Sequence, residues 1–265
     1  MRPVFSSISK RVRRQWRYQF GGRRRAKVRQ FRDIHRGRHC FVLGNGPSLN
    51  AVDLVRLNRE YTFGVNGIHL AHEDKGFEPT YYIVEDGLYL EQHASEINKI
   101  DYSVRFFPER YSDFISQPCG DTYFLLFDWS VYNSKLLDYR NPNFSTDVEQ
   151  RTGTGGSIIF VALQLAYYMG FDPVYLVGMD HTSVIPPGAV HIRNNRYRFE
   201  GKDPNHFRDD YVTHEDVYLP DRELINRGFT KAREAFERDG RSVLNATVGG
   251  QLEVFKRVDL DSVIS

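Results

Sequence analysis

The stretch FVLGNGPSLN, residues 41–50, sets the interpretation of the whole chain. A short apolar run ends in the glycines Gly44 and Gly46, and Ser48 then opens a segment with a helical pattern. The dinucleotide-binding pattern G-x-G-x-x-G needs a third glycine where this chain has Leu49, and the P-loop pattern needs a lysine that is missing here. The stretch therefore predicts a strand–turn–helix unit that departs from both common phosphate-binding loops.

From residue 38 onward, short apolar runs alternate with amphipathic stretches. Strands separated by helices predict an α/β fold with a single doubly wound, mostly parallel, Rossmann-like sheet. Residues 182–220 have no clean period and are rich in Pro, Asn, Arg and aromatic residues, so we expect a lid there. Strands are expected at residues 39–43, 61–65, 81–84, 103–107, 123–127, 173–177 and 242–244, and helices at 48–57, 157–169, 221–238 and up to about residue 98.

The net charge of +2 over 265 residues conceals a strong asymmetry. Residues 1–38 hold 14 lysines and arginines against one acidic residue, and the remaining residues carry a net charge of −11. No apolar run reaches the roughly 18–20 residues needed to span a bilayer, and no signal-peptide core is present. Two cysteines are too few for a disulfide framework, so we expect a cytoplasmic protein.

The basic residues 1–37 form an arm ahead of the catalytic domain, which we expect at residues 38–265. Apolar residues recur at every fourth position of the arm, so a helix would gather them on one face with arginines around them. This pattern predicts a peripheral contact with the anionic inner face of a membrane. A solvated, disordered arm, a nucleic-acid contact and a mitochondrial presequence are the alternatives. The apolar residues are Ile8, Val12, Trp16 and Phe20.

Residues that end the expected strands are candidates for a site, because a parallel sheet binds ligands beyond the carboxyl ends of its strands. Each is an ordinary turn residue by itself, but four such strand ends together predict one site. Glycines in the first turn allow a ligand to approach the backbone, and a helix start would direct N–H groups at an anion. This geometry suits one phosphate. The residues are Gly44-Asn45-Gly46, Asn66, Glu85-Asp86 and Asp180-His181.

A second glycine-rich stretch, RTGTGGS at residues 151–157, precedes the expected helix 157–169. It offers a guanidinium group, hydroxyl groups and a helix start, which together suit a carboxylate or a second phosphate. A capped, glycine-rich loop with a surface arginine is the alternative. A general base near neutral pH would be a histidine, and His206 lies in the expected lid. His181 and His214 are rivals, and spacing alone does not choose among the three.

These motifs together resemble a known group of proteins. GNGPSL follows the first strand, an asparagine ends the second, an Arg-Thr-Gly stretch opens a helix that leads into YLVGMD, and a His-aromatic pair follows in the lid. The combination resembles the bacterial sialyltransferases of glycosyltransferase family 42. It is more similar still to the related group that is like archaeal 6-hydroxymethyl-dihydropterin diphosphokinase (MptE-like), which is often found in surface-polysaccharide gene clusters. The resemblance covers roughly residues 38–258.

The resemblance implies a donor with a single phosphate, CMP-sialic acid. It implies that Asn45 and Asn66 contact the cytidine monophosphate and that Thr154 or its neighbour binds the phosphate or carboxylate of the donor. His206 would deprotonate the acceptor hydroxyl in an inverting displacement of CMP, without a metal. Asp86 departs from the family, since the sialyltransferases have an asparagine there, and a carboxylate would repel phosphate or bind Mg²⁺.

The lid departs from the family as well. Thr182 stands at the first position where the sialyltransferases place a tyrosine that assists the leaving phosphate. Tyr197 and Tyr211 are candidate substitutes that do not align with it. The identity of the sugar therefore stays open.

Three hypotheses follow. The first is a glycosyltransferase that moves a sialic-acid-like nonulosonate or related sugar from a CMP-activated donor to a glycan or lipid-linked acceptor, with no cofactor, metal or nucleic acid, and with a homo-oligomer left possible. The second is a Mg²⁺-dependent diphosphokinase acting on ATP and a hydroxymethylpterin, with Glu85, Asp86 and Asp180 as metal ligands. The third is a non-catalytic nucleotide-binding protein. The candidate donor site comprises Gly44, Asn45, Gly46, Ser48, Asn66, Asp86, Arg151, Thr152, Thr154, Gly155, Asp180 and Thr182, and His206 is the candidate base.

Overall fold

The computed structural model of the chain describes residues 27–115, 121–211 and 216–264. The expected apolar face of the basic arm lies outside these residues. Among the helices of the described residues, none has the length and apolarity needed to cross a bilayer.

A parallel sheet of eight strands forms the centre of the molecule, in the order β13-β12-β8-β1-β2-β3-β4-β5. The chain runs outward from β1 to β5 on one side, then returns to β8 and builds the other side. The direction of winding therefore reverses between β1 and β8, and the α/β, doubly wound, Rossmann-like prediction is confirmed. The strands span Cys40–Leu43 (β1), Thr62–Val65 (β2), Tyr81–Ile83 (β3), Val104–Pro108 (β4), Thr122–Leu125 (β5), Val174–Val177 (β8), Val243–Asn245 (β12) and Lys256–Arg257 (β13).

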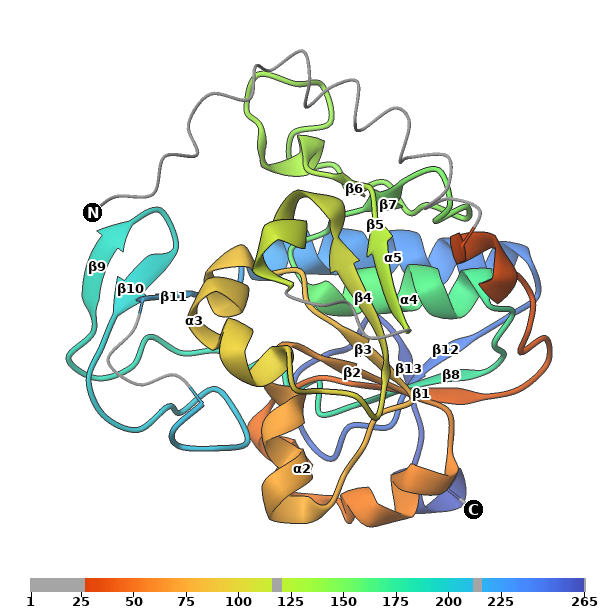
Figure 1. Cartoon of the computed structure of the whole chain (residues 1–265), viewed down its shortest axis with the longest axis horizontal. Coiled ribbons are helices and arrows are strands. Elements are labelled where there is room, and N and C mark those ends of the chain that lie inside the picture. The colour runs from red at the N-terminus through yellow and green to blue at the C-terminus, as the bar shows by residue number, and fades with distance from the viewer. Residues whose placement is uncertain (1–26, 116–120, 212–215, 265) are drawn as a thin grey trace.

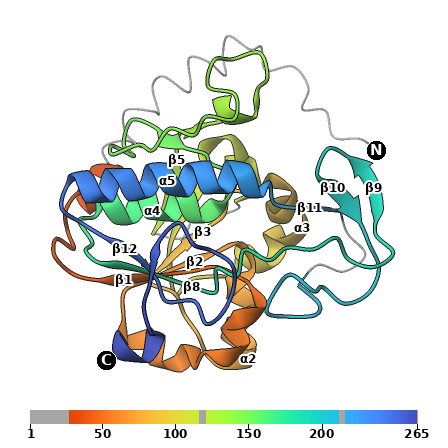
Figure 2. The same cartoon turned by 180° about the vertical axis from the view of Figure 1, so that it is seen from behind.

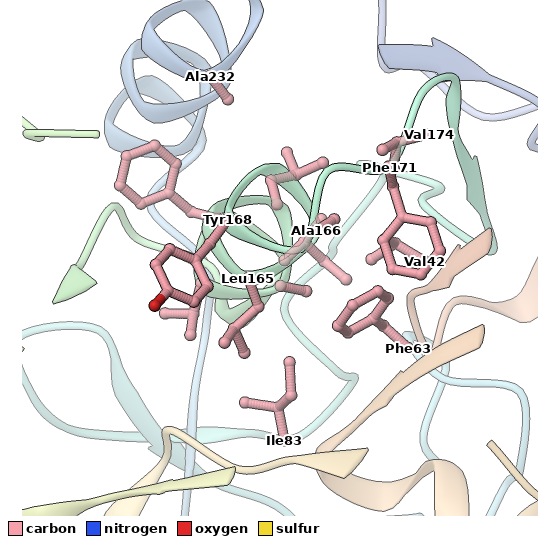
Figure 3. Close-up of a cluster of buried hydrophobic side chains, with 14 of the residues drawn as sticks. Val42, Phe63, Ile83, Leu165, Ala166, Tyr168, Phe171, Val174 and Ala232 are labelled. Atoms are coloured by element: carbon pink, nitrogen blue, oxygen red, sulfur yellow. The ribbon is translucent and has the colours of Figure 1, made fainter. Parts of the chain in front are cut away.

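Helices cover both faces of this sheet (Figures 1 and 2). Helix α4 (Ile158–Tyr168) and helix α5 (Arg222–Arg238) lie over one face, while α2 (Leu70–Lys75) and α3 (Gly87–Ile97) lie over the other. Nine of the eleven residues of α4 are buried, because the helix is apolar all round and lies between the sheet and α5. Figure 3 shows this packing through Val42, Phe63 and Ile83 of the sheet, Leu165, Ala166 and Tyr168 of α4, Phe171, Val174, and Ala232 of α5.

The expected helix over residues 48–57 is wrong in detail. Two 3-10 helices stand there, η2 (Pro47–Ala51) and η3 (Leu54–Arg59). Val52 between them is extended, with ψ of 130°, and the Asp53 carboxylate accepts a hydrogen bond from the Val55 amide at the start of η3. A side chain that caps a new turn in this way breaks a continuous helix.

The lid holds regular structure that the sequence pattern did not predict. Strands β9 (Val190–Arg193), β10 (Arg196–Arg198) and β11 (Asp216–Tyr218) form a small antiparallel sheet in the order β11-β10-β9. Strand β13 was also missed. The remaining elements are η1 (Arg29–Phe31), η4 (Asn66–His69), η5 (Glu109–Phe114), η6 (Ser130–Tyr132), η7 (Leu260–Ser262), and the paired strands β6 (Phe127–Asp128) and β7 (Thr152–Gly153).

The end of the expected basic arm packs against the domain. Val28 and Phe31 are buried in the core that surrounds α4. Arg29 and Arg32 form ion pairs with Glu149, which is itself buried. The described part of the arm therefore contributes to the hydrophobic core.

Candidate functional site

The reversal point between β1 and β8 is closed by contacts within the protein. The Ser48 hydroxyl donates a hydrogen bond to Asp180 Oδ2 at 2.6 Å, and the Ser48 amide lies 3.2 Å from Asp180 Oδ1. A Cβ atom on Gly46 would lie 1.9 Å from Asp180 Oδ2, and one on Gly44 would lie 2.5 Å from the Gly178 carbonyl oxygen. The two glycines thus admit the loop after β8, and the anion that the Ser48 amide binds here is Asp180.

Two asparagines at the ends of β1 and β2 carry buried amide oxygens. Asn45 Nδ2 donates to the Val65 carbonyl oxygen and to the Tyr211 hydroxyl, both at 2.9 Å. Within the described residues, Asn45 Oδ1 and Asn66 Oδ1 are buried and accept no hydrogen bond. Buried polar atoms in native proteins are almost always paired, so these oxygens mark places where a ligand can supply hydrogen-bond donors.

The lid brings His206 to the same edge of the sheet. His206 Nδ1 lies 2.6 Å from Oδ2 of Asp203, a carboxylate that is almost fully buried. The imidazole stacks on the ring of Tyr211 at 3.8 Å between centroids and 3° between planes. Since Asp203 takes Nδ1, the other ring nitrogen, Nε2, is the one that can exchange a proton with a substrate.

Tyr211 attaches this histidine to the sheet. Its hydroxyl accepts hydrogen bonds from Asn45 Nδ2 and from the Gly67 amide, each at 2.9 Å. Burial raises the pKa of Tyr211, so the phenol stays neutral. A second attachment runs through Phe207, whose amide donates to the Asn45 carbonyl oxygen at 2.9 Å. The histidine is therefore tied to the ends of β1 and β2 through two lid residues.

A small cavity of about 70 Å³ adjoins His206. It is too small for a nucleotide sugar, since ligand pockets usually measure about 300–1,000 Å³. A larger cavity of about 320 Å³ involves Gly170 and Asp172, at the amino end of β8, and so lies at the opposite edge of the sheet. The small cavity is lined by Ser183, Phe199, Asp203, Asn205, His206 and residues 217–220.

Glu85 is an isolated acid at the end of β3. Its side chain is buried, with only 8% of the residue exposed. Burial, followed by the neighbouring Asp86 charge, raises the pKa of Glu85 from 4.5 to about 8. The group is therefore largely protonated at neutral pH and can donate a hydrogen bond.

Asp86 has a structural partner, the start of α3. Its Oδ1 accepts hydrogen bonds from the Leu88 amide at 2.8 Å and the Tyr89 amide at 3.3 Å. Burial raises the pKa of Asp86, and these two amides and Arg196 act in the opposite direction. Asp86 is thus the N-cap of a helix.

The set of Mg²⁺ ligands expected for a diphosphokinase is not assembled. Within the described part of the chain, no three His, Cys, Asp or Glu side chains lie close enough together to hold a metal ion. Asp180 binds Ser48, and Asp86 caps α3. Glu85 is buried and takes part in neither contact. The donors present therefore do not fit the ion.

The second glycine-rich stretch is fixed by the protein around it. Arg151 pairs with Asp128 at 3.2 Å, and the Thr154 hydroxyl donates to the Asp128 carbonyl oxygen at 2.6 Å. Thr152 is buried, and its hydroxyl has no partner among the described residues. A Cβ on Gly155 would lie 2.7 Å from the Phe160 ring. These contacts hold the loop ahead of α4, and the amides of Gly153 and Gly156 themselves donate to Gln164 Oε1 and the Tyr132 hydroxyl, respectively.

Thr182, His181 and His214 are the remaining candidate residues. Thr182 is half-buried at the start of the lid. His181 adopts a positive φ of 56°, and burial, with a smaller effect of Arg222, lowers its pKa. The third histidine, His214, lies outside the described residues. His206 is thus the histidine that the described structure pairs with a carboxylate at the carboxyl edge.

The sequence of this chain also matches a known protein family. The family described as 6-hydroxymethylpterin diphosphokinase MptE-like matches residues 22–184, more than half of the chain. The chain belongs to the MptE-like family. This confirms the resemblance to the MptE-like group that was drawn from the GNGPSL motif and its partners. No curated protein matches the chain.

A solved structure has the same fold as this MptE-like chain. It is described as the structure of MAf glycosyltransferase from Magnetospirillum magneticum AMB-1, with a TM-score of 0.50 and 14% sequence identity. The match covers 92% of this chain and 39% of that one, so the MptE-like chain spans well under half of its neighbour's length. At this identity the similarity establishes the fold alone.

Sequence reasoning overlooked Asp203 and named Tyr211 in another role in the candidate site of this MptE-like chain. Asp203 was not assigned a role, although it stands three residues before His206, a spacing that allows contact within one turn. Tyr211 is a candidate substitute for the tyrosine that assists the leaving phosphate, and the structure stacks its ring on His206. The Asp-x-x-His spacing could have indicated the first residue. No local signal indicates the second, because its partners Asn45 and Gly67 are far away in sequence.

Proposed function

We propose that this MptE-like protein is a glycosyltransferase that moves a sialic-acid-like sugar from a CMP-activated donor to a glycan or lipid-linked acceptor. The observation that carries the proposal is the Asp203–His206 pair, stacked on Tyr211 beside the unpaired amide oxygens of Asn45 and Asn66. A general base and a hydrogen-bonding surface for a polar ligand thus share one edge of the sheet.

His206 would act as the general base. Its Nε2 takes the proton of the acceptor hydroxyl while the acceptor oxygen bonds to the anomeric carbon of the donor sugar. The bond between that carbon and the phosphate oxygen breaks, and CMP leaves with the electron pair, so the configuration inverts. Asp203 holds the imidazole by Nδ1 and stabilises the imidazolium that forms.

The donor would lie between two surfaces. Hydroxyl or amino groups of the nucleoside would donate to Asn45 Oδ1 and Asn66 Oδ1, which removes the cost of two unpaired buried oxygens. The phosphate or the sugar carboxylate would lie near Arg151 and the start of α4, an eleven-residue helix capped by Ser157. Protonated Glu85 could donate to an anionic oxygen there, which a charged carboxylate could not do.

The diphosphokinase is the second candidate, and the family description favours it. It requires Mg²⁺ to neutralise the phosphates, and Glu85, Asp86 and Asp180 do not form a ligand set for that ion. The glycosyltransferase needs no such set, and the fold shared with a glycosyltransferase of known structure is compatible with it. A non-catalytic nucleotide-binding protein is the third candidate.

Ligand-induced thermal stabilisation separates the three, because a ligand that binds only the folded state raises the melting temperature. We expect CMP to stabilise the protein in buffer containing EDTA, and Asn45→Ala to reduce the shift. Stabilisation by ATP, Mg²⁺ and a hydroxymethylpterin but not by CMP would instead support the diphosphokinase. If CMP stabilises and no sugar transfer to a glycan acceptor occurs with a panel of CMP-sugars, the non-catalytic alternative gains.

A further inference from the structure

The small sheet of the lid projects from the body of the molecule. In Figures 1 and 2 the β9–β10 ribbon lies at the far side of the structure, beyond α3. Strand β9 is an edge strand, and all four of its residues are exposed, so neither of its faces packs on the domain. Its β-branched residues Val190 and Ile192 are 61% and 41% exposed. Exposed apolar side chains grouped on a protruding element mark a contact surface.

The neighbouring loop adds to this surface. Val184 and Ile185 are both more than half exposed and lie in the loop that leads to β9, with four residues between them and the strand. Residues 184–202 contain four arginines and lysines and one glutamate, whereas the chain beyond residue 38 is acidic overall. Of the four basic residues, Lys202 is paired with Asp209, and Arg196 lies near Asp86 and the Tyr218 ring. Arg193, at the end of β9, is exposed next to Ile192. Aliphatic and basic side chains are thus grouped on one projecting segment of an otherwise acidic domain.

We propose that residues 184–202 are a contact surface for an anionic lipid bilayer. Basic residues are attracted to the negative surface potential of such a bilayer, and protruding aliphatic side chains enter its interface. Edge-to-edge pairing of β9 with a second copy of the chain is the competing use of this exposed strand, and it would make a dye response at position 192 depend on protein concentration without lipid.

The position of this surface bears on the acceptor, a consequence that rests on the proposed function. The cavity beside His206 is also lined by Val217 and Tyr218 of β11, in the same small sheet as β9. A bilayer against residues 184–202 would therefore bring a membrane-embedded acceptor close to the base. The proposed membrane contact therefore predicts a lipid-linked acceptor.

A position-specific probe tests the membrane contact in the full chain. Cys40 is buried, so a Cys119→Ser background allows an environment-sensitive dye to be attached at Ile192→Cys. A matched control is Val55→Cys on η3, which is 56% exposed. We expect the dye at position 192 to shift to the blue with phosphatidylcholine vesicles containing phosphatidylglycerol. The dye at position 55 should not respond.

The second measurement is the effect of removing a basic charge on binding to the vesicles. Arg193→Gln should weaken binding to the mixed vesicles about fivefold at low salt, the effect of one basic residue near the surface. Arg238→Gln, an exposed arginine at the end of α5, should leave binding unchanged. Vesicle binding without a response at position 192 would assign membrane contact to another segment and overturn the proposal. So would a dye response that grows with protein concentration in the absence of lipid.

The outcome is separable from that of the proposed function. Ile192→Asp should lose transfer to an acceptor embedded in vesicles and keep both CMP-induced stabilisation and transfer to a water-soluble acceptor. If the variant and the parent bind the vesicles equally, the membrane surface is wrong whether or not the protein transfers sugar.

Discussion

Ser48 and Asp180 join the two halves of the sheet at the point where its winding reverses, through a hydrogen bond of 2.6 Å from the serine hydroxyl to the carboxylate. Ser48 follows β1 and Asp180 follows β8. In many folds of this class a ligand anion lies at the same place. Here a side chain of the protein supplies the anion, and Gly46 is the residue that leaves room for it.

This relationship makes Gly46 sensitive to substitution. Gly46→Ala should lower the free energy of unfolding by about 1–3 kcal/mol, because its Cβ would overlap Asp180 Oδ2 and shift the loop after β8. Urea denaturation measures this change. Adding Asp180→Gly should recover part of the loss, since it removes the overlapping carboxylate. Equal stability of Gly46→Ala and the parent would show that the two loops are not in close contact.

The Asp203–His206 pair leads to a prediction about turnover. His206→Ala should reduce sugar transfer by about 10²–10⁴-fold, the usual contribution of a general base, and leave CMP-induced stabilisation intact. Asp203→Asn should also lower turnover, because it weakens the hold on Nδ1 while preserving shape. Initial rates under saturating donor measure both. Turnover of His206→Ala at the parent rate would remove His206 as the base.

Tyr211 should hold the lid closed through its hydroxyl. Tyr211→Phe keeps the ring beneath His206 but leaves Asn45 Nδ2 short of one acceptor and the buried Gly67 amide without this partner, at a cost of about 1–3 kcal/mol for a buried group left unsatisfied. The lid should then open more often, and trypsin should cut residues 184–202 faster. Tyr139→Phe, at a half-exposed position elsewhere, is the matched control. Unchanged cleavage of Tyr211→Phe would argue against this attachment.

Glu85 should make stability depend on pH. Its pKa in the folded protein is about 8, above the usual 4.5, so the folded state binds more protons than the unfolded state between these values. Stability should therefore fall as pH rises from about 5 to 8, at up to about 1.4 kcal/mol per pH unit. Glu85→Gln, which cannot ionise, should flatten this slope in Mg²⁺-free buffer. Glu91→Gln, at an exposed position, should keep the parent slope. If Glu85→Gln also keeps the parent slope, the raised pKa of Glu85 is not the cause of the pH dependence.

The regular core was predictable because its signals are local. Helix α4 lies within one residue of its expected bounds, since Ser157 caps its start and a continuous apolar run follows. Helix α5 likewise begins after its cap, Asp221. The lid was not predictable in the same way, because β9, β10 and β11 are only three or four residues long, and β11 comes from a segment some twenty residues further along. Alternation over three or four residues is too brief to distinguish a strand from a loop.

The candidate site also separates into features with local sequence signals and contacts between distant segments. The sequence by itself determined the α/β fold and the polar strand ends, because hydrophobic periodicity and turn chemistry act between neighbours along the chain. It offered His206 as one of three candidate histidines, and only the family resemblance favoured it over the other two. Only the tertiary structure decided which of these residues meet. It pairs Ser48 with Asp180, joins Tyr211 to Asn45, and leaves the Asn45 and Asn66 oxygens without a partner among the described residues. Such contacts depend on where distant segments come together when the sheet winds in both directions from β1, and no local pattern encodes them.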